Sequence, residues 1–244
     1  GIWSDWQTQG TRLSRNVLYA NRRDLFVEVS HGPYVVEHNV LASPASVELW
    51  SEGGAFVNNL LLGTVRSQKV MERATPYHVP HSTQVAGYAV IYGGDDRWIG
   101  NVFVGGDVAT AYLRAEEPSS RPFYGTGGYD GRPASLEEYI ALVGEPSRGD
   151  LDRFLDVPQP VYVRGNVYAS GARPFEREED PLVLTGATSF IVVDEGEAVY
   201  LEASLTDVFG RSTVAAVAGA DLPRVRFVGA EFEERDGTPL VVDV

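Results

Sequence analysis

Three acidic residues near the start of the chain stand at the same distance from an asparagine. Asp5, Glu28 and Glu48 each lie 11 residues before an asparagine, inside a short run of mostly apolar residues. Two carboxyl groups held close together can act as nucleophile and general acid/base on one substrate. The spacing therefore indicates catalytic chemistry if the fold brings equivalent positions side by side.

These asparagines belong to a motif that recurs five times: Asn, then two or more apolar or aromatic residues, then a small residue. The five are Asn16, Asn39, Asn59, Asn101 and Asn166, separated by 23, 20, 42 and 65 residues. The intervals correspond to one, one, two and three units of about 21 to 22 residues, a length typical of repeat architectures. Because β-branched and aromatic runs alternate with Gly, Asn, Pro and Ser, we expect strands joined by turns.

The repeat predicts an all-β fold, a right-handed parallel β-helix in which each unit adds one coil. We expect it over residues 1–172, with an excursion at 106–160 that contains an α-helix at 135–143, capped by Ser135 and Glu138. Each asparagine is expected at the same corner, in a left-handed backbone conformation, with its amide bonded to those above and below. Chance recurrence of Asn-Val and Asn-Leu at loop ends is the alternative.

The pattern changes after residue 172. Short alternating strands separated by Asp-Glu-Gly and Asp-Gly turns predict a smaller antiparallel sheet, part of a sandwich, over residues 173–244. The expected strands are 182–184, 189–193, 198–204, 224–228 and 240–244. Residues 64–100 also break the period, because one coil there has no asparagine, and a loop is expected at 66–80.

In such a stack the three acids leave the same face of one sheet. Adjacent strands lie about 4.7 to 4.9 Å apart, which predicts carboxyl groups roughly 5 Å from one another. Retaining glycosidases hold their two carboxyl groups about 5 to 5.5 Å apart, whereas inverting enzymes need about 6.5 to 9.5 Å. Because stacked like charges repel each other, we interpret the pair as functional. A solvated acidic column on a negative protein is the alternative.

Aromatic and polar residues around these acids are compatible with sugar binding. Trp3 and Trp6 flank Asp5, and an indole face can stack on pyranose C–H groups, although tryptophan is more often a core residue. His31 lies three residues after the second acid and can bond a sugar hydroxyl or tune that acid. Glu48 extends the acidic column, where it modulates the pair or faces water.

Six stretches of the chain also form a recognisable set. They are 1–10 (GIWSDWQTQG), 26–33 (FVEVSHGP), 50–56 (WSEGGAF), 75–78 (TPYH), 81–83 (HST) and 93–97 (GGDDR). Together they resemble β-xylosidases of glycoside hydrolase family 120, and the resemblance covers most of the chain. It implies a right-handed parallel β-helix combined with a β-sandwich, and cleavage of β-xylosides with retention.

The resemblance also implies roles for the two acids. It assigns Asp5 as nucleophile and Glu28 as acid/base, an assignment that the symmetric stacking of two carboxylates leaves open. Gln84 departs from the glutamate of the family pattern, so an assisting polar contact is altered there. We further expect earlier β-helix coils, from the same precursor or another chain, to complete the site, and a homo-oligomer is compatible with this arrangement.

Two further polar clusters are candidates for substrate binding. His78 and His81 are expected to bind sugar hydroxyls, with a structural role or metal ligation as alternatives. Zinc usually needs three or four ligands, so no metal site is expected. Asp96 and Arg97 follow two glycines and are expected to bind sugar or Ca²⁺, or to form a self-satisfied turn. No cofactor is expected, apart from a structural Ca²⁺ ion.

The composition limits the partners of the protein. Its 244 residues include 34 acidic and 20 basic ones, a formal charge of −14, which argues against nucleic acid and anionic membrane surfaces. The absence of cysteine excludes disulfides and a cysteine nucleophile. No apolar run approaches the roughly 18 to 20 residues that span a bilayer. The composition favours neither a cytoplasmic nor a secreted location.

The sequence thus predicts a retaining glycosidase that cleaves β-xylosidic bonds of xylo-oligosaccharides by double displacement. A polysaccharide lyase is the first alternative, although lyases usually need Ca²⁺ or basic residues beside their base, and the column here is acidic. A carbohydrate-binding or adhesion module is the second, in which the stacked acids are incidental.

Overall fold

The computed structural model describes residues 1–105 and 161–204, without residues 7, 80, 92, 176 and 187, together with the single residues 222, 236 and 238. Within these residues the chain is all-β and contains no helix. No described helix is therefore long and apolar enough to cross a membrane. The helix predicted at 135–143 and the strands predicted at 224–228 and 240–244 lie outside the described residues.

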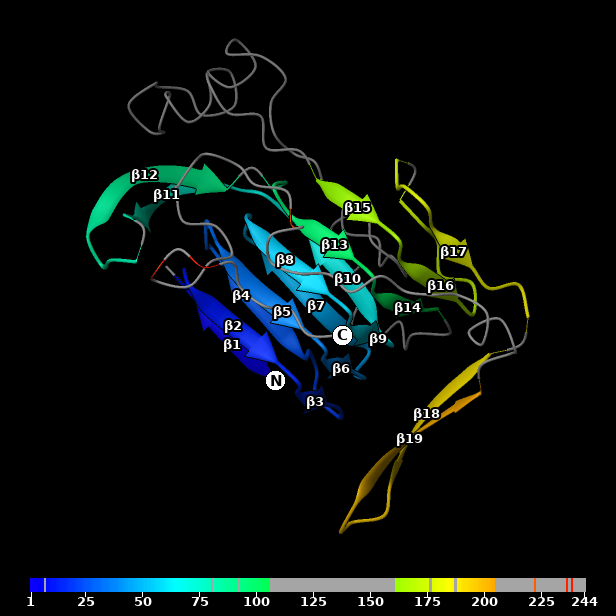
Figure 1. Cartoon of the computed structure of the whole chain (residues 1–244). Coiled ribbons are helices and arrows are strands. Elements are labelled where there is room, and N and C mark those ends of the chain that lie inside the picture. Colours follow the sequence, from blue (N-terminus) through cyan, green and yellow to red (C-terminus); the bar gives the residue numbers. More distant parts are fainter. Residues whose placement is uncertain are drawn as a thin grey trace.

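Three parallel sheets form the body of the molecule, and the chain visits them in turn (Figure 1). The first sheet contains β1 (Ile2–Asp5), β4 (Leu25–Glu28), β7 (Ala45–Trp50) and β10 (Thr64–Ser67). The second contains β2 (Thr11–Ser14), β5 (Tyr34–Glu37), β8 (Gly54–Val57), β13 (Arg97–Ile99) and β15 (Tyr162–Arg164). The third contains β3 (Val17–Leu18), β6 (Val40–Leu41), β9 (Leu60–Leu61), β14 (Val102–Val104), β16 (Val167–Ala169) and β17 (Leu182–Val183). Within each sheet every strand pairs with its equivalent in a neighbouring coil, so the predicted repeat is present as stacked coils.

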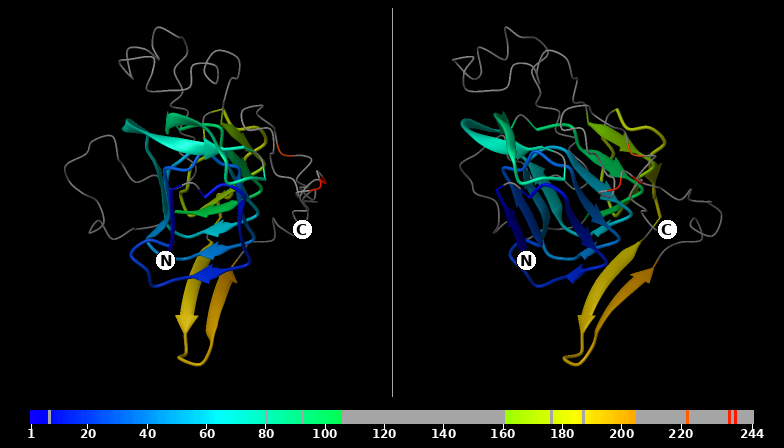
Figure 2. Two further views of the ribbon diagram at one scale, coloured as in Figure 1. Left: turned by 90° about the vertical axis from the view of Figure 1, so that its left-hand side faces the viewer. Right: turned by 60° about the vertical axis from the view of Figure 1, so that its left-hand side comes forward.

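The three sheets enclose a common apolar interior, which the left view of Figure 2 shows along the stack. Parallel stacking places equivalent side chains above one another, so aromatic residues pair between coils. Phe56 stacks on Trp98 with ring centroids 4.0 Å apart, and Phe103 stacks on Tyr168 at 5.3 Å. All four side chains are buried. This packing makes the coils a rigid support for residues on their outer face.

The recurring asparagines form a continuous hydrogen-bonded ladder, as predicted. The backbone N–H and the Nδ2 of Asn39 both donate to Oδ1 of Asn59, each at 3.0 Å. The same pair of bonds links Asn16 to Asn39, Asn59 to Asn101 and Asn101 to Asn166. The last asparagine, Asn166, donates the same two bonds to Oε1 of Glu178, and Oε2 of Glu178 accepts a hydrogen bond from the hydroxyl of Tyr168.

The left-handed conformation expected at each asparagine lies one residue earlier, so that prediction was wrong. At these corners the residues with positive φ are Arg15, His38, Asn58, Gly100 and Gly165. Each stands directly before a ladder asparagine. The preceding residue turns the corner, which leaves the asparagine side chain aligned with its equivalents in the neighbouring coils.

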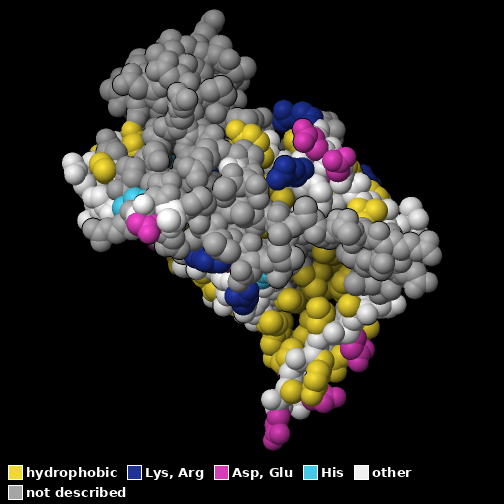
Figure 3. Space-filling view, viewed as in Figure 1, with side chains coloured by type: hydrophobic (Ala, Val, Ile, Leu, Met, Phe, Trp, Pro, Cys, Tyr) yellow, Lys and Arg dark blue, Asp and Glu magenta, His cyan; other side chains and the backbone are white. Residues whose placement is uncertain are grey.

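Two antiparallel hairpins extend from the coils. The first, β11 (Val70–His78) with β12 (Val85–Ile91), is inserted between β10 and β13, where the sequence lacks a ladder asparagine. The second pairs β18 (Ser189–Asp194) with β19 (Val199–Ser204), close to the ranges predicted for two antiparallel strands. Hydrophobic side chains gather on the surface at this second hairpin (Figure 3), where Ile191 and Tyr200 are half exposed.

The strand predicted at 182–184 was expected in an antiparallel sheet, and this was wrong. β17 pairs parallel with β16, with Leu182 opposite Val167. Its backbone therefore continues the third parallel sheet beyond residue 172, because the unpaired edge of β16 accepts one more strand. The division into domains at residues 172 and 173 stays a prediction.

Candidate active site

Asp5 and Glu28 lie directly opposite each other at the carboxyl ends of β1 and β4. The two strands are parallel and in register, so both side chains leave the same outer face of the first sheet. Adjacent strands are about 4.7 to 4.9 Å apart, which places the two positions one strand spacing from each other. Asp5 is exposed, whereas the side chain of Glu28 is only 14% exposed. The neighbouring positions expected from the repeat are therefore present.

Glu48 does not continue this column, contrary to the prediction. Across β4 and β7, Trp50 stands opposite Glu28, and Glu48 stands opposite Phe26. The connection from β7 to β8 is shorter by two residues than that from β4 to β5, so counting back from the asparagine misplaces the register. Because side chains alternate with a period of two, Glu48 still faces outward. It bonds Arg23 and lies 3.5 Å from Arg66.

Both carboxylate oxygens of Glu28 accept a hydrogen bond. The Nε1 of Trp3 donates to Oε2 at 3.1 Å, and Nη2 of Arg73 donates to Oε1 at 2.9 Å. Trp3 belongs to β1 and stays 63% exposed, so its ring is available to a ligand. Arg73 comes from the β11–β12 hairpin and was missed in the sequence, where nothing local connects it to a residue 45 positions earlier.

The residue after each acid has a left-handed backbone. Trp6 has a φ of 41° and Val29 a φ of 46°. Their N–H groups donate to the carbonyls of Glu28 and Trp50 in the next coil, at 3.1 and 2.7 Å. Positive φ is unfavourable for residues other than glycine, above all for a β-branched one, and such strain gathers at functional sites. The turns after Asp5 and Glu28 thus share one strained geometry, with Trp6 left 56% exposed beside the acid.

His31 is buried and bonded within the chain. Its Nδ1 lies 3.1 Å from Oε1 of Glu52, and its Nε2 lies 2.9 Å from Oγ1 of Thr75. The ring also meets the edge of Tyr77. His31 therefore links the turn after Glu28 to the following coil and to the β11–β12 hairpin. The ring bonds Glu52 and Thr75, so both roles predicted for it, bonding a sugar hydroxyl and tuning Glu28, stay predictions.

Asp96 and Arg97 both have partners within the protein. Oδ1 of Asp96 accepts the N–H of Gly54 at 3.0 Å, and Arg97 bonds Oδ1 of Asp95 at 2.7 Å beneath the ring of Tyr162. Both are almost fully buried. Burial raises the pKa of Asp96 well above its usual range, and the charge of Asp95 adds to this, while the Gly54 N–H opposes it. In the part of the chain that the structure describes, no group of three His, Asp or Glu residues is arranged to hold a metal.

The remaining predicted residues lie at the tip of the β11–β12 hairpin. His78 ends β11, and its N–H donates to Oε1 of Gln9 at 2.6 Å, which ties the tip to the connection after Asp5. His81 and Gln84 are exposed in the turn. The hairpin therefore contacts the segments that follow both acids, through Gln9 and through His31.

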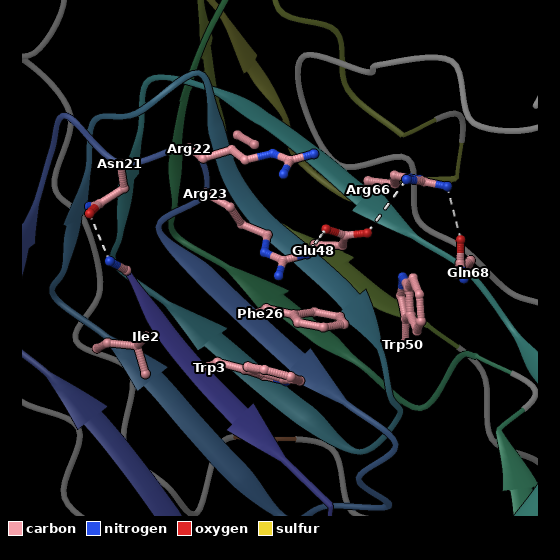
Figure 4. A pocket seen from close by; sticks show the side chains of 12 residues that line it. Ile2, Trp3, Asn21, Arg22, Arg23, Phe26, Glu48, Trp50, Arg66 and Gln68 are labelled. Atoms are coloured by element: carbon pink, nitrogen blue, oxygen red, sulfur yellow. Dashed lines mark hydrogen bonds and ion pairs between the residues drawn. The ribbon is translucent and has the colours of Figure 1, made fainter. Parts of the chain in front are cut away.

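A pocket of about 530 Å³ opens on the outer face of the first sheet (Figure 4). Its floor is a row of aromatic rings: Trp3 stacks on Phe26 with centroids 5.9 Å apart, and Phe26 meets the edge of Trp50 at 5.1 Å. Its other side is polar and is lined by Arg22, Arg23, Glu48, Arg66 and Gln68. Of these lining residues, only Trp3 and Glu48 were predicted from the sequence as site residues. Trp50 can be identified as a pocket residue only from the strand register, which places it opposite Glu28.

The described residues thus define an all-β protein of stacked parallel coils, with a carboxylate pair and an aromatic pocket on one sheet face. Comparison with solved structures finds a protein described as "The complex structure of XylC with xylose". It is 46% identical in sequence, with a TM-score of 0.77. The match covers 99% of this chain and 36% of that one, so the chain spans about a third of the other protein's length. No protein-family model and no curated protein matches the chain.

Proposed function

We propose that this chain is the catalytic part of a retaining glycoside hydrolase of family 120 that cleaves β-xylosidic bonds. The observation that carries the proposal is the in-register pairing of Asp5 and Glu28 on neighbouring parallel strands. One strand spacing is close to the separation of about 5 to 5.5 Å that a retaining mechanism needs. The 46% identity to a protein solved with xylose supports the choice of sugar. We infer that the stacked coils form a right-handed parallel β-helix.

In this proposal Asp5 is the nucleophile. Among the described residues it has no hydrogen-bond or ion-pair partner, and it is exposed, so a sugar can reach it. Its carboxylate attacks the anomeric carbon while Glu28 gives a proton to the departing glycosidic oxygen. Glu28 then removes a proton from the water that hydrolyses the glycosyl ester, and two inversions produce net retention.

The contacts of Glu28 constrain how it delivers a proton. Trp3 and Arg73 can only donate hydrogen bonds, so a proton on Glu28 must occupy a site that neither of them uses, and it weakens the bond to the oxygen that carries it. Arg73 is the candidate to give way, because it lies on the inserted hairpin, whereas Trp3 lies on the neighbouring strand of the same sheet and stacks on Phe26. We propose that Trp3 orients the acid and that the arriving substrate displaces Arg73.

Hydrolysis of an aryl β-xyloside by the full-length protein tests the function. We expect nitrophenol release, a β-xylose product at the first turnovers by NMR, and loss of turnover in Asp5→Asn. Glu28→Gln should slow the release of the glycosyl ester, and azide should restore turnover by replacing the water that needs a base. An α-xylose product at first turnover would refute the retaining mechanism.

A lyase remains the second candidate because arginines lie beside the carboxylate pair. Arg73 bonds Glu28, and three arginines line the adjacent pocket, which supplies the basic residues that a lyase needs beside an uronate. A new double-bond absorbance on uronate polymers, abolished by Glu28→Gln, would favour this function over hydrolysis.

We also propose that further coils stack against β1, β2 and β3. Oδ1 of each later asparagine accepts two N–H groups from the preceding coil, whereas Oδ1 of Asn16 accepts none from the described residues. An additional coil with an equivalent asparagine would satisfy it. The greater length of the matched protein supports this arrangement.

A further inference from the structure

The polar side of the pocket carries an excess of positive charge on an acidic protein. Arg22, Arg23 and Arg66 line it together with one carboxylate, that of Glu48. The whole chain has a formal charge of −14, so this local reversal of sign is not explained by composition. A concave surface lined by one sign of charge attracts a ligand of the opposite sign.

The three arginines are not equally occupied. Arg23 bonds Glu48 and lies over the Phe26 ring at 3.9 Å. Arg66 lies 3.5 Å from Glu48 and donates to Gln68 at 3.0 Å. Arg22 is exposed and has no hydrogen-bond or ion-pair partner among the described residues. In Figure 4 its side chain extends along the rim towards Arg66. The charge available to a ligand is therefore greatest at this rim.

The floor of the pocket suits a sugar ring. Trp3 is 63% exposed over Phe26, and the pocket volume of about 530 Å³ lies within the range of small-molecule sites. Trp3 also bonds the candidate acid/base, so a ring lying on Trp3 is next to the reacting bond. The pocket and the carboxylate pair thus belong to one continuous surface.

We propose that this pocket binds a uronic acid unit of a decorated xylo-oligosaccharide. Its carboxylate pairs with Arg22 and Arg66, and its ring lies against Trp3. A guanidinium matches a carboxylate through two parallel hydrogen bonds, which a neutral sugar cannot reproduce. The assignment deepens the proposed function and rests on it for the xylan backbone, but the carboxylate preference is measurable without turnover.

The test compares one ligand with its neutral equivalent. Xylotriose carrying a single glucuronic acid group, and the methyl ester of the same molecule, are titrated calorimetrically into the full-length Asp5→Asn protein at low ionic strength. We expect the acid to bind roughly five- to tenfold more tightly, since exposed ion pairs are weak individually but two arginines act together. The preference should shrink in high salt.

Substitutions then test whether the preference for the carboxylate depends on Arg22 and Arg66. Arg22→Gln combined with Arg66→Gln should reduce it to about twofold or less. Arg164→Gln is the matched control, because Arg164 is an exposed arginine on β15 of the second sheet. Glu48→Gln should instead increase the preference, because it removes the carboxylate that competes for Arg23 and Arg66.

Equal affinity for the acid and its ester, no binding of either, or a preference that survives the double arginine substitution would each overturn the proposal. Aryl xyloside hydrolysis without a carboxylate preference would overturn the subsite and leave the hydrolase standing. A carboxylate preference that depends on Arg22 and Arg66 in a protein without hydrolytic activity would support the subsite and contradict the proposed function.

Discussion

The asparagine ladder provides a stability prediction that can be worked out bond by bond. The side chain of Asn59 is fully buried and makes four hydrogen bonds. It accepts two from Asn39 and donates to the Val36 carbonyl at 2.8 Å and to Oδ1 of Asn101 at 2.9 Å. At about 1 kcal/mol net for each bond, with buried groups left unsatisfied, Asn59→Ala should lower the free energy of unfolding by roughly 4 kcal/mol.

In the 244-residue chain by itself, without the further coil proposed above, Asn16 is the matched control, since it occupies the same corner but is only half buried. Its side chain donates to the Ser14 carbonyl at 3.1 Å and to Oδ1 of Asn39 at 2.9 Å, and water can replace both contacts. Asn16→Ala should therefore cost about 1 kcal/mol. Urea unfolding followed by circular dichroism measures both values, provided that the slope m is unchanged.

A third variant separates the donors from the acceptor. Asn59→Asp keeps one oxygen that accepts from Asn39. Its second oxygen replaces the Nδ2 donor and faces two acceptors, the Val36 carbonyl and Oδ1 of Asn101. At neutral pH it should destabilise at least as much as Asn59→Ala, and it should recover when acid protonates the new carboxylate. Equal losses for Asn16→Ala and Asn59→Ala, or a loss below about 1 kcal/mol at Asn59, would refute the bond-by-bond reasoning.

Three further predictions concern Glu28, Asp96 and the end of the ladder. Trp3→Phe keeps a ring over Phe26 but loses the bond to Glu28, so kcat on an aryl xyloside should fall roughly tenfold with KM little changed; an unchanged kcat would exclude an orienting role. Because burial raises the pKa of Asp96, its protonated form stabilises the fold below the ordinary aspartate range, and this stability is lost as pH rises through the folded pKa. Thermal unfolding of Asp96→Asn should therefore improve relative to the wild type from about pH 4 towards neutrality, and parallel pH curves would contradict this. Glu178→Ala should cost roughly 2 to 3 kcal/mol in urea unfolding and Glu178→Gln about 1, because only glutamine keeps an acceptor for Asn166; equal costs would count against capping.

The strained turn after Glu28 shows where sequence reasoning reached its limit. Nothing in the residue type of Val29 predicts a positive φ, and a β-branched residue argues against one. The conformation is imposed by the N–H bond to Trp50 and by the buried anchor of His31 on Glu52 and Thr75. These partners come from the next coil and from an inserted hairpin, so their effect depends on the assembled fold.

The carboxylate pair could be predicted, whereas its setting could not. The asparagine period alone identified which strands are neighbours, because each coil must return to the same corner, and it placed Asp5 beside Glu28. Only the tertiary structure decided which residue of β7 stands opposite Glu28. The turn after β7 is two residues shorter, and this brings Trp50 to the place expected for Glu48.

The sequence by itself thus determined the stacking of coils, the ladder and the pair of acids, since these depend on a period that the chain repeats locally. The tertiary structure decided that Arg73 reaches Glu28, that His31 and Arg97 are buried, and that arginines gather around Glu48. Such contacts depend on turn lengths and on an insertion that follows no period, so they cannot be predicted from residue spacing along the chain.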